Sequence, residues 1–182
     1  LKAKLPETDP AVVTAIHNLG VASYQARKPD AEVLLGKALS LREKSDGKDS
    51  IPVAFSSGML GRALFRARDF AGAEALMRRA LQIFRQHEKQ QAAMVSRTLD
   101  DLTLLLIESG ELTKAEKSLR ENEETTSRLF GENHQVRQAL IQRRGELHRA
   151  RGELEEAEKF FVRSLEFHTS QYGEKSGGAV NA

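Results

Sequence analysis

The sequence predicts an all-α fold of four antiparallel helix hairpins, stacked side by side as a solenoid. Three observations lead to this prediction. An Ala-Glu pair recurs every 42 residues, apolar residues follow helical spacing within each repeat, and short polar turns divide each repeat in two. The four pairs are Ala31-Glu32, Ala73-Glu74, Ala115-Glu116 and Ala157-Glu158.

The repeats account for nearly all of the 182 residues. We place them at about 9–49, 50–89, 90–131 and 132–172, inside an array over 9–172. A lead of residues 1–8 precedes the array, and a Gly-rich tail, 173–182, is expected to be flexible.

In the first two repeats, a capping residue and a proline predict where the first helix begins. These residues are Asp9 before Pro10 and Ser50 before Pro52. Turns such as Arg68-Asp69 and Gly152-Glu153 are too short for anything except an antiparallel return. Glycines in register near three repeat ends, Gly47, Gly131 and Gly173, predict helix stops.

The second helices carry continuous apolar stripes. The stripe of the second repeat includes Ala73, Met77, Ala80 and Phe84, and that of the fourth repeat is Ala157, Phe160, Phe161, Leu165 and His168. The third repeat departs from this pattern, because Asn122 and Glu123 stand where apolar residues are expected. Either the helix shifts at this point, or a partner or solvent satisfies these two groups.

Composition excludes several classes of protein. A net charge of +2 is too balanced for a protein that grips nucleic acid through its phosphates. The absence of Cys excludes disulfides and thiolate metal sites, and no apolar run is long enough to cross a membrane. We expect no nucleic-acid partner, no membrane insertion and a cytoplasmic location.

The sequence holds no pattern that predicts catalysis. Its five histidines form no pair at helical metal-ligand spacing, and its acidic runs fit solvated helix faces. We therefore expect a non-enzymatic protein without a cofactor or a resident metal.

The apolar and small residues of the first two repeats resemble those of tetratricopeptide repeats, and the period of 42 is similar to the kinesin light chain type. The residues that carry the resemblance are Ile16, Leu19, Gly20, Ala31, Leu35 and Ala38, then Leu60, Gly61, Leu64, Ala73, Met77 and Ala80. Membership of this family implies a right-handed superhelical solenoid that binds a peptide or protein.

The resemblance also implies which residues face the concave groove and contact a partner. They are His17, Tyr24, Arg62, Phe65, Arg66, Arg97, Asp100, Leu104, Gln142, Arg143, Glu146 and Arg149. The Lys and Asn of a carboxylate clamp are replaced by His17 and Val21, so we expect no clamp for a chain terminus.

Arg62 and Arg66 lie one helical turn apart with Phe65 between them. One hypothesis is that this cluster grips an acidic segment with a bulky apolar anchor. The alternative is that both arginines pair within the array, with acids such as Asp100 or Asp101.

The leading functional prediction is a scaffold or adaptor, and the alternative is a regulatory peptide-sensing module of a larger signalling or transcriptional protein. The last helix is expected to expose Phe160, Phe161 and Phe167. These residues suggest an additional element or a truncation beyond that helix, or self-association through it.

Overall fold

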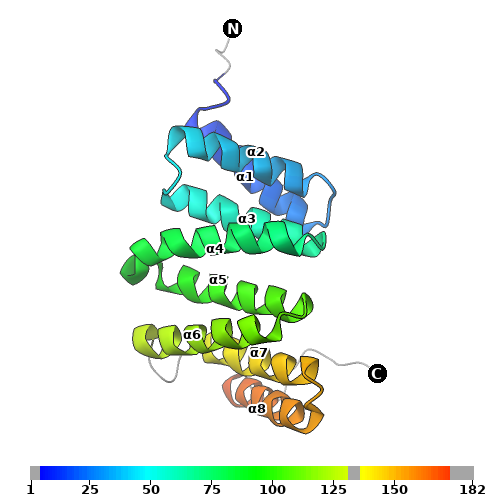
Figure 1. The fold of residues 1–182 in the computed structure, drawn as a ribbon. Coiled ribbons are helices and arrows are strands. Elements are labelled where there is room, and N and C mark those ends of the chain that lie inside the picture. Colours follow the sequence, from blue (N-terminus) through cyan, green and yellow to red (C-terminus); the bar gives the residue numbers. More distant parts are fainter. Residues whose placement is uncertain (1–4, 131–135, 173–182) are drawn as a thin grey trace. The chain divides into compact units, whose positions relative to one another are not determined.

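The computed structural model describes residues 5–130 and 136–172. These residues form eight α-helices and no strand, which confirms the all-α repeat class (Figure 1). The helices are α1 (Pro10–Gln25), α2 (Ala31–Ser45), α3 (Ile51–Arg66), α4 (Phe70–Gln86), α5 (Glu88–Glu108), α6 (Leu112–Phe130), α7 (Val136–Ala150) and α8 (Leu154–Tyr172). The predicted helix stops at Gly131 and Gly173 and the predicted flexible tail fall outside the described residues.

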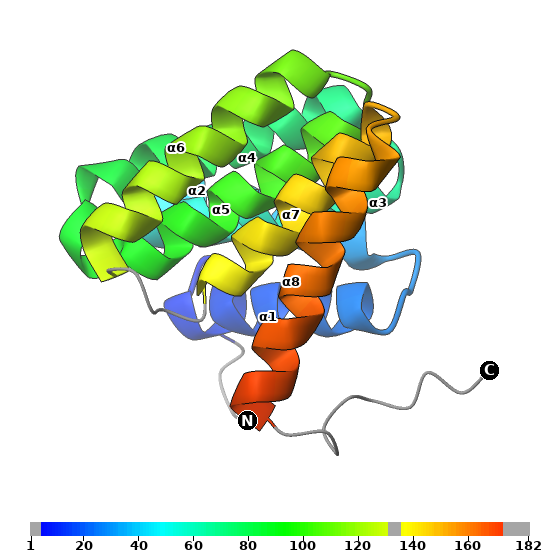
Figure 2. The same cartoon turned by 90° about the horizontal axis from the view of Figure 1, so that it is seen from below.

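The chain divides into two compact units, Leu1–Asp101 and Leu102–Ala182. In the first unit α1 contacts α2 and α3, α2 contacts α3, and α3 contacts α4. In the second unit α7 contacts both α6 and α8, and Figure 2 shows α7 and α8 packed as a pair. Helix α5 is shared between the units and has a non-helical residue near its start, Gln91. The handedness of a superhelix stays a prediction.

The turns inside the four hairpins have the same geometry. Each contains one residue with positive φ, namely Arg27 (55°), Arg68 (69°), Gly110 (80°) and Gly152 (78°). The amide of the next residue donates to the carbonyl five residues earlier, as from Asp69 to Leu64 and from Glu153 to His148. This is the Schellman arrangement, which satisfies the last carbonyls of the first helix and turns the chain back.

The two helices of a hairpin approach closely at a glycine of the first helix. A Cβ atom on Gly61 would lie 3.0 Å from Met77 Cγ and 3.2 Å from the Ala73 carbonyl oxygen. On Gly20 it would lie 2.9 Å from Leu35 Cγ, and on Gly145 it would lie 2.8 Å from Phe161 Cε1. The absence of a side chain at these positions therefore sets the distance between the paired helices.

The third hairpin solves the same packing problem with different residues. Thr103 occupies the position of the glycine. Ser118 takes the place of Leu34, Leu76 and Phe160, which come directly before the residues closest to the glycine in the other hairpins. Both side chains are buried, and the hydroxyl of Thr103 donates to Ser118 Oγ at 3.0 Å. A larger residue on one helix is thus offset by a smaller one on its partner, and the buried hydroxyls satisfy each other.

The exposed apolar residues of α8 differ from those predicted. Phe160, Phe161 and Phe167 are half-buried, and Phe161 lies against Gly145 of α7. Leu165, which belongs to the predicted apolar stripe, is 66% exposed, and Leu154 and Val162 are also exposed. Phe160 and Phe161 thus contact α7 within the hairpin, whereas Leu165 is largely exposed to solvent.

We predict that Gly61→Ala lowers the free energy of unfolding by about 1–3 kcal/mol, since the new methyl group overlaps Met77 and a backbone oxygen. Gly36→Ala is the matched control, because its Cβ meets no atom within 4 Å in the interior of α2. This control should raise stability by up to about 1 kcal/mol. Urea titrations of both variants measure the difference, and equal effects would contradict the close-approach argument.

The turn geometry yields an opposed pair of substitutions. Arg27→Gly should stabilise the protein by about 0.5–1 kcal/mol, because it relieves a side chain from a left-handed backbone conformation. Gly152→Ala should destabilise it by about 1 kcal/mol although nothing lies within 4 Å of the new methyl group. Thermal unfolding of both variants checks the signs, and a stabilising Gly152→Ala would refute the explanation.

Candidate functional site

The first helices α1, α3 and α5, the last as far as Asp101, form what we call the first-helix face of the first unit. The guanidinium of Arg66 on α3 lies over the Tyr24 ring of α1, 3.7 Å from its centroid. The predicted arginine-aromatic contact therefore forms with Tyr24. Phe65 instead lies near Phe70 of α4, with ring centroids 6.0 Å apart.

Arg62 forms a two-pronged ion pair with Asp101. Its Nε and Nη2 atoms donate to Oδ2 and Oδ1 at 2.7 and 2.8 Å. Burial raises the pKa of Asp101, while the charge and hydrogen bonds of Arg62 oppose this rise. The pairing within the array is thus confirmed for Arg62, whereas none of the ion pairs found among the described residues involves Arg66.

An apolar pocket opens on this face between α3 and α5. Phe55 is 39% exposed, and its ring packs edge to face against the buried ring of Phe84, with the two ring centroids 5.1 Å apart. Methionines from both helices form the walls, and an exposed arginine of α5 lies at the rim. The lining residues are Ala54, Phe55, Gly58, Met59, Arg62, Phe84, Met94, Arg97, Thr98 and Asp101.

Sequence reasoning identified Arg62 and Arg97 of this pocket and missed its apolar part. A signal was present, because Phe55, Met59 and Arg62 are spaced i, i+4 and i+7 and so share one side of α3. Met94 gives no such signal, since only the packing of α5 brings it opposite Met59.

The structure places His17 in a hydrogen-bond chain between hairpins. Arg42, which is buried, donates to Ser56 Oγ at 2.9 Å and to the Pro52 carbonyl at 3.0 Å. Ser56 Oγ lies 3.2 Å from His17 Nδ1 and can donate its proton there. Burial, aided by the charge of Arg42, lowers the pKa of His17 to about 4. His17 therefore helps to join α1 to α3.

The predicted site residues of the second unit lie mainly on α7. Gln142 and Arg143 both donate to Glu146, Gln142 at 3.4 Å. Arg149 is exposed at the end of α7, and Leu104 is half-buried on α5. In the first unit, Asp100 is half-buried beside the paired Asp101. The predicted set therefore forms two groups, one in each unit.

Ion pairs between α6 and α7 explain the polar residues of the third repeat. Arg144 donates to Glu123 at 2.9 and 2.6 Å, while buried Asn122 lies 3.4 Å from the Thr126 hydroxyl. Glu116 accepts from Arg144 and pairs with Arg151. Burial opposes its ionisation, but the Arg120 hydrogen bond and these two charges lower its pKa. Glu123 and Asn122 thus have partners inside the protein.

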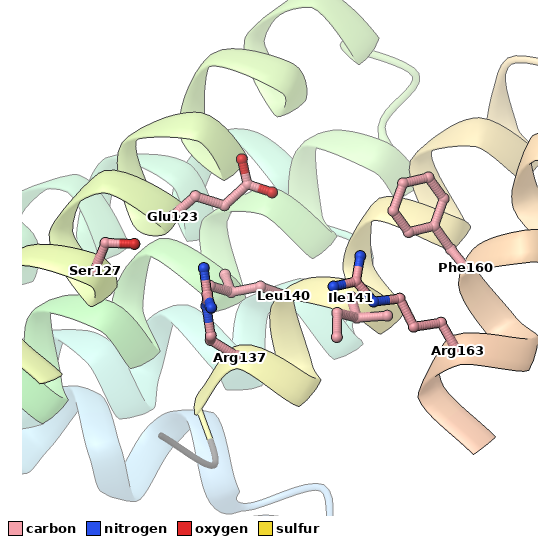
Figure 3. Close-up of a pocket in the computed structure, with 7 residues that line it drawn as sticks. All are labelled: Glu123, Ser127, Arg137, Leu140, Ile141, Phe160 and Arg163. Carbon is pink, nitrogen blue, oxygen red and sulfur yellow. The ribbon is translucent and has the colours of Figure 1, made fainter. Parts of the chain in front are cut away.

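A second pocket lies between α6, α7 and α8. Figure 3 shows Phe160 and Arg163 of α8 on one side of this pocket and Glu123 and Ser127 of α6 on the other, with Arg137 of α7 between them. None of the predicted site residues lines this pocket.

Comparison with known proteins identifies the repeat. Residues 11–86 match the model of the tetratricopeptide repeat family. The first two hairpins therefore match the tetratricopeptide repeat family. No curated protein sequence matches the chain significantly.

Solved structures extend the likeness to the whole chain. Kinesin light chain nearly identical TPR-like repeats from Podosopora anserina are 16% identical, with a TM-score of 0.77 over 93% of this chain and 81% of theirs. BtubC (BKLC) from P. vanneervenii is 20% identical, with a TM-score of 0.76 over 100% of this chain and 72% of its own. The predicted resemblance to kinesin-light-chain-like tetratricopeptide repeats is confirmed at the level of fold.

Over residues 5–130 and 136–172, no three His, Asp or Glu residues are grouped so that they could hold a metal ion. No helix among the same residues is both long and apolar enough to span a membrane.

The burial of His17 generates a pH-dependent prediction. Because its folded pKa of about 4 lies below the unfolded value near 6.5, the neutral ring stabilises the fold fully above pH 6.5. This stability is lost as the pH falls from 6.5 towards 4, by about 1–2 kcal/mol at pH 5 after allowance for partial exposure.

The comparison of wild type with His17→Gln isolates this effect, because both proteins share every other titrating group. Urea unfolding at pH 7 and at pH 5 should show that the free energy of unfolding falls less between the two pH values in the variant than in the wild type. An NMR titration that finds the His17 pKa near 6.5 would disprove the burial argument.

Proposed function

We propose that this chain is a non-catalytic scaffold that binds a partner peptide or protein on the first-helix face of its first unit. Tetratricopeptide repeats generally mediate protein–protein interactions. The observation that carries the proposal is the apolar pocket between α3 and α5, which is open to solvent and lined in part by the exposed Arg97. A second exposed arginine, Arg66, lies on α3 one helical turn beyond the lining residue Arg62.

The pocket suits a single bulky apolar side chain. Phe55 supplies a partly exposed ring, and Met59 and Met94 are flexible enough to adjust to different shapes. An apolar anchor that enters such a pocket removes its own surface and the exposed part of Phe55 from water, which favours binding.

The charge around the pocket favours an acidic segment. Arg62 is neutralised by Asp101, so it contributes little attraction. The flat face of the Arg66 guanidinium stacks on the Tyr24 ring, so its N–H groups, which lie in the guanidinium plane, stay available to other acceptors. Together with Arg97 it can donate to carboxylates that flank the anchor. The partner is thus the same as in the hypothesis from the sequence, an acidic segment with a bulky apolar anchor. The arginines that bind it are Arg66 and Arg97 instead of Arg66 and Arg62.

A selection from a random peptide display library tests this function. The wild-type chain should enrich peptides that combine an aromatic or large aliphatic residue with Asp or Glu. Arg66→Glu with Arg97→Glu should reduce binding of the enriched peptides at least about tenfold, since two attractive charges become repulsive. Arg62 is left intact in this design, because its replacement would also break the pair with Asp101.

Arg78→Glu is the matched control, because it makes the same charge change at an exposed residue of α4 outside the pocket. Its binding should stay within about twofold of wild type, as expected for a distant surface charge. Met59→Glu tests the pocket itself and should abolish binding. Unchanged binding in the double arginine variant, or no enrichment by wild type, would overturn the proposal.

A further inference from the structure

Neighbouring hairpins meet through one repeated interface. The second helix of one hairpin packs on the first helix of the next, as α2 does on α3 and α6 on α7. The ion pair between Glu123 of α6 and Arg144 of α7 marks the register of this interface. The 42-residue repeat spacing identifies the residues of the other hairpins that are equivalent to Glu123 and to Arg144.

On the second helices, the residues equivalent to Glu123 are Leu39, Leu81 and Leu165. Leu39 and Leu81 are only 8% and 4% exposed, and Glu123 is held by Arg144. Leu165 is 66% exposed. Helix α8 therefore presents an interface residue that no helix among the described residues covers.

On the first helices, the residues equivalent to Arg144 are Leu102, Leu60 and Leu19. Leu102 is 1% exposed and Leu60 is half-buried, but Leu19 is 56% exposed. Ala11, Ala15 and Ala22 are also exposed. Together with Leu19 they are spaced i, i+4, i+8 and i+11, so all four lie on the same side of α1.

The composition of α1 supports burial of this side. Helix α1 contains no Asp, Glu, Lys or Arg, whereas α7 contains four arginines and one glutamate. A helix that faces water normally carries charged residues on its outer side. Small residues beside a single leucine are suited to close packing of another helix.

We propose that copies of this chain associate head to tail, with α8 of one copy packed on α1 of a second copy in the register of the α6–α7 interface. Leu165 of the first copy then meets Leu19 of the second. The exposed sides of α8 and α1 are the two complementary halves of an interface that the chain already uses between its own hairpins. This contact is heterologous, so a dimer still has one α1 and one α8 outside the contact, and these can pair with further copies in the same way.

Sedimentation velocity over a range of concentrations tests the association. The wild-type chain should form dimers and then larger species as its concentration rises. Leu19→Glu and Leu165→Glu should each weaken self-association at least about tenfold, because a charge would enter an apolar contact. A wild-type chain that stays monomeric at every concentration would overturn the proposal.

Mixing the two variants distinguishes head-to-tail packing from a symmetric contact between two α8 helices. The Leu165→Glu protein retains an intact α1, and the Leu19→Glu protein retains an intact α8, so the mixture should form a 1:1 dimer that grows no further. Association of the Leu19→Glu protein with itself at wild-type strength would show a symmetric contact and refute the head-to-tail arrangement.

The register has its own test. The double variant Leu19→Arg, Leu165→Glu reproduces the Arg144–Glu123 pair between copies, so it should associate at least about tenfold more tightly than Leu165→Glu alone. An equal affinity would refute the register. Val33→Glu is the matched control, because Val33 is exposed on α2 at a position where later repeats have Ala75, Lys117 and Lys159, all exposed. It should leave association unchanged, and circular dichroism should show that all variants are folded.

Discussion

The close approach of paired helices is the constraint on which the rest of the structure depends. Gly20, Gly61 and Gly145 have no side chain at the point where the second helix crosses, and facing side chains fill the space that a Cβ would need. The contact fixes the spacing within a hairpin, and thereby the side that each hairpin presents to the next. Thr103 with Ser118 shows that the combined volume of the two facing residues matters more than glycine itself.

The interface between hairpins tolerates a change of chemistry at a fixed geometry. Leucines are buried at this position in the first two second helices, and Glu123 takes their place in the third, where it pairs with Arg144. Such an ion pair adds little net stability when it is partly buried, because desolvation offsets the attraction. Glu123 does, however, require an oppositely charged residue on the next hairpin, so the interface between α6 and α7 differs from the interfaces that are formed by leucines.

The candidate site was predictable where local spacing determines it. Arg62 and Arg66 are predictable because one helical turn separates them, and the sequence also contains Asp101 as a possible partner for Arg62. The contact between Arg66 and Tyr24, the pocket wall formed by Met94, and the chain from Arg42 through Ser56 to His17 all join different helices. Each depends on how far one helix is shifted along another, which residue spacing within a helix does not specify.

The sequence by itself determined the fold class, the helix hairpin as the repeating unit, and the likeness to tetratricopeptide repeats. It could do so because periodicity and turn residues are local properties that recur every 42 residues. The tertiary structure alone decided which arginine is neutralised, which methionines form a pocket, and that Leu165 is exposed while Phe161 packs against Gly145. An apolar residue on a helix can face either its hairpin partner or the next hairpin, and only packing in three dimensions separates the two.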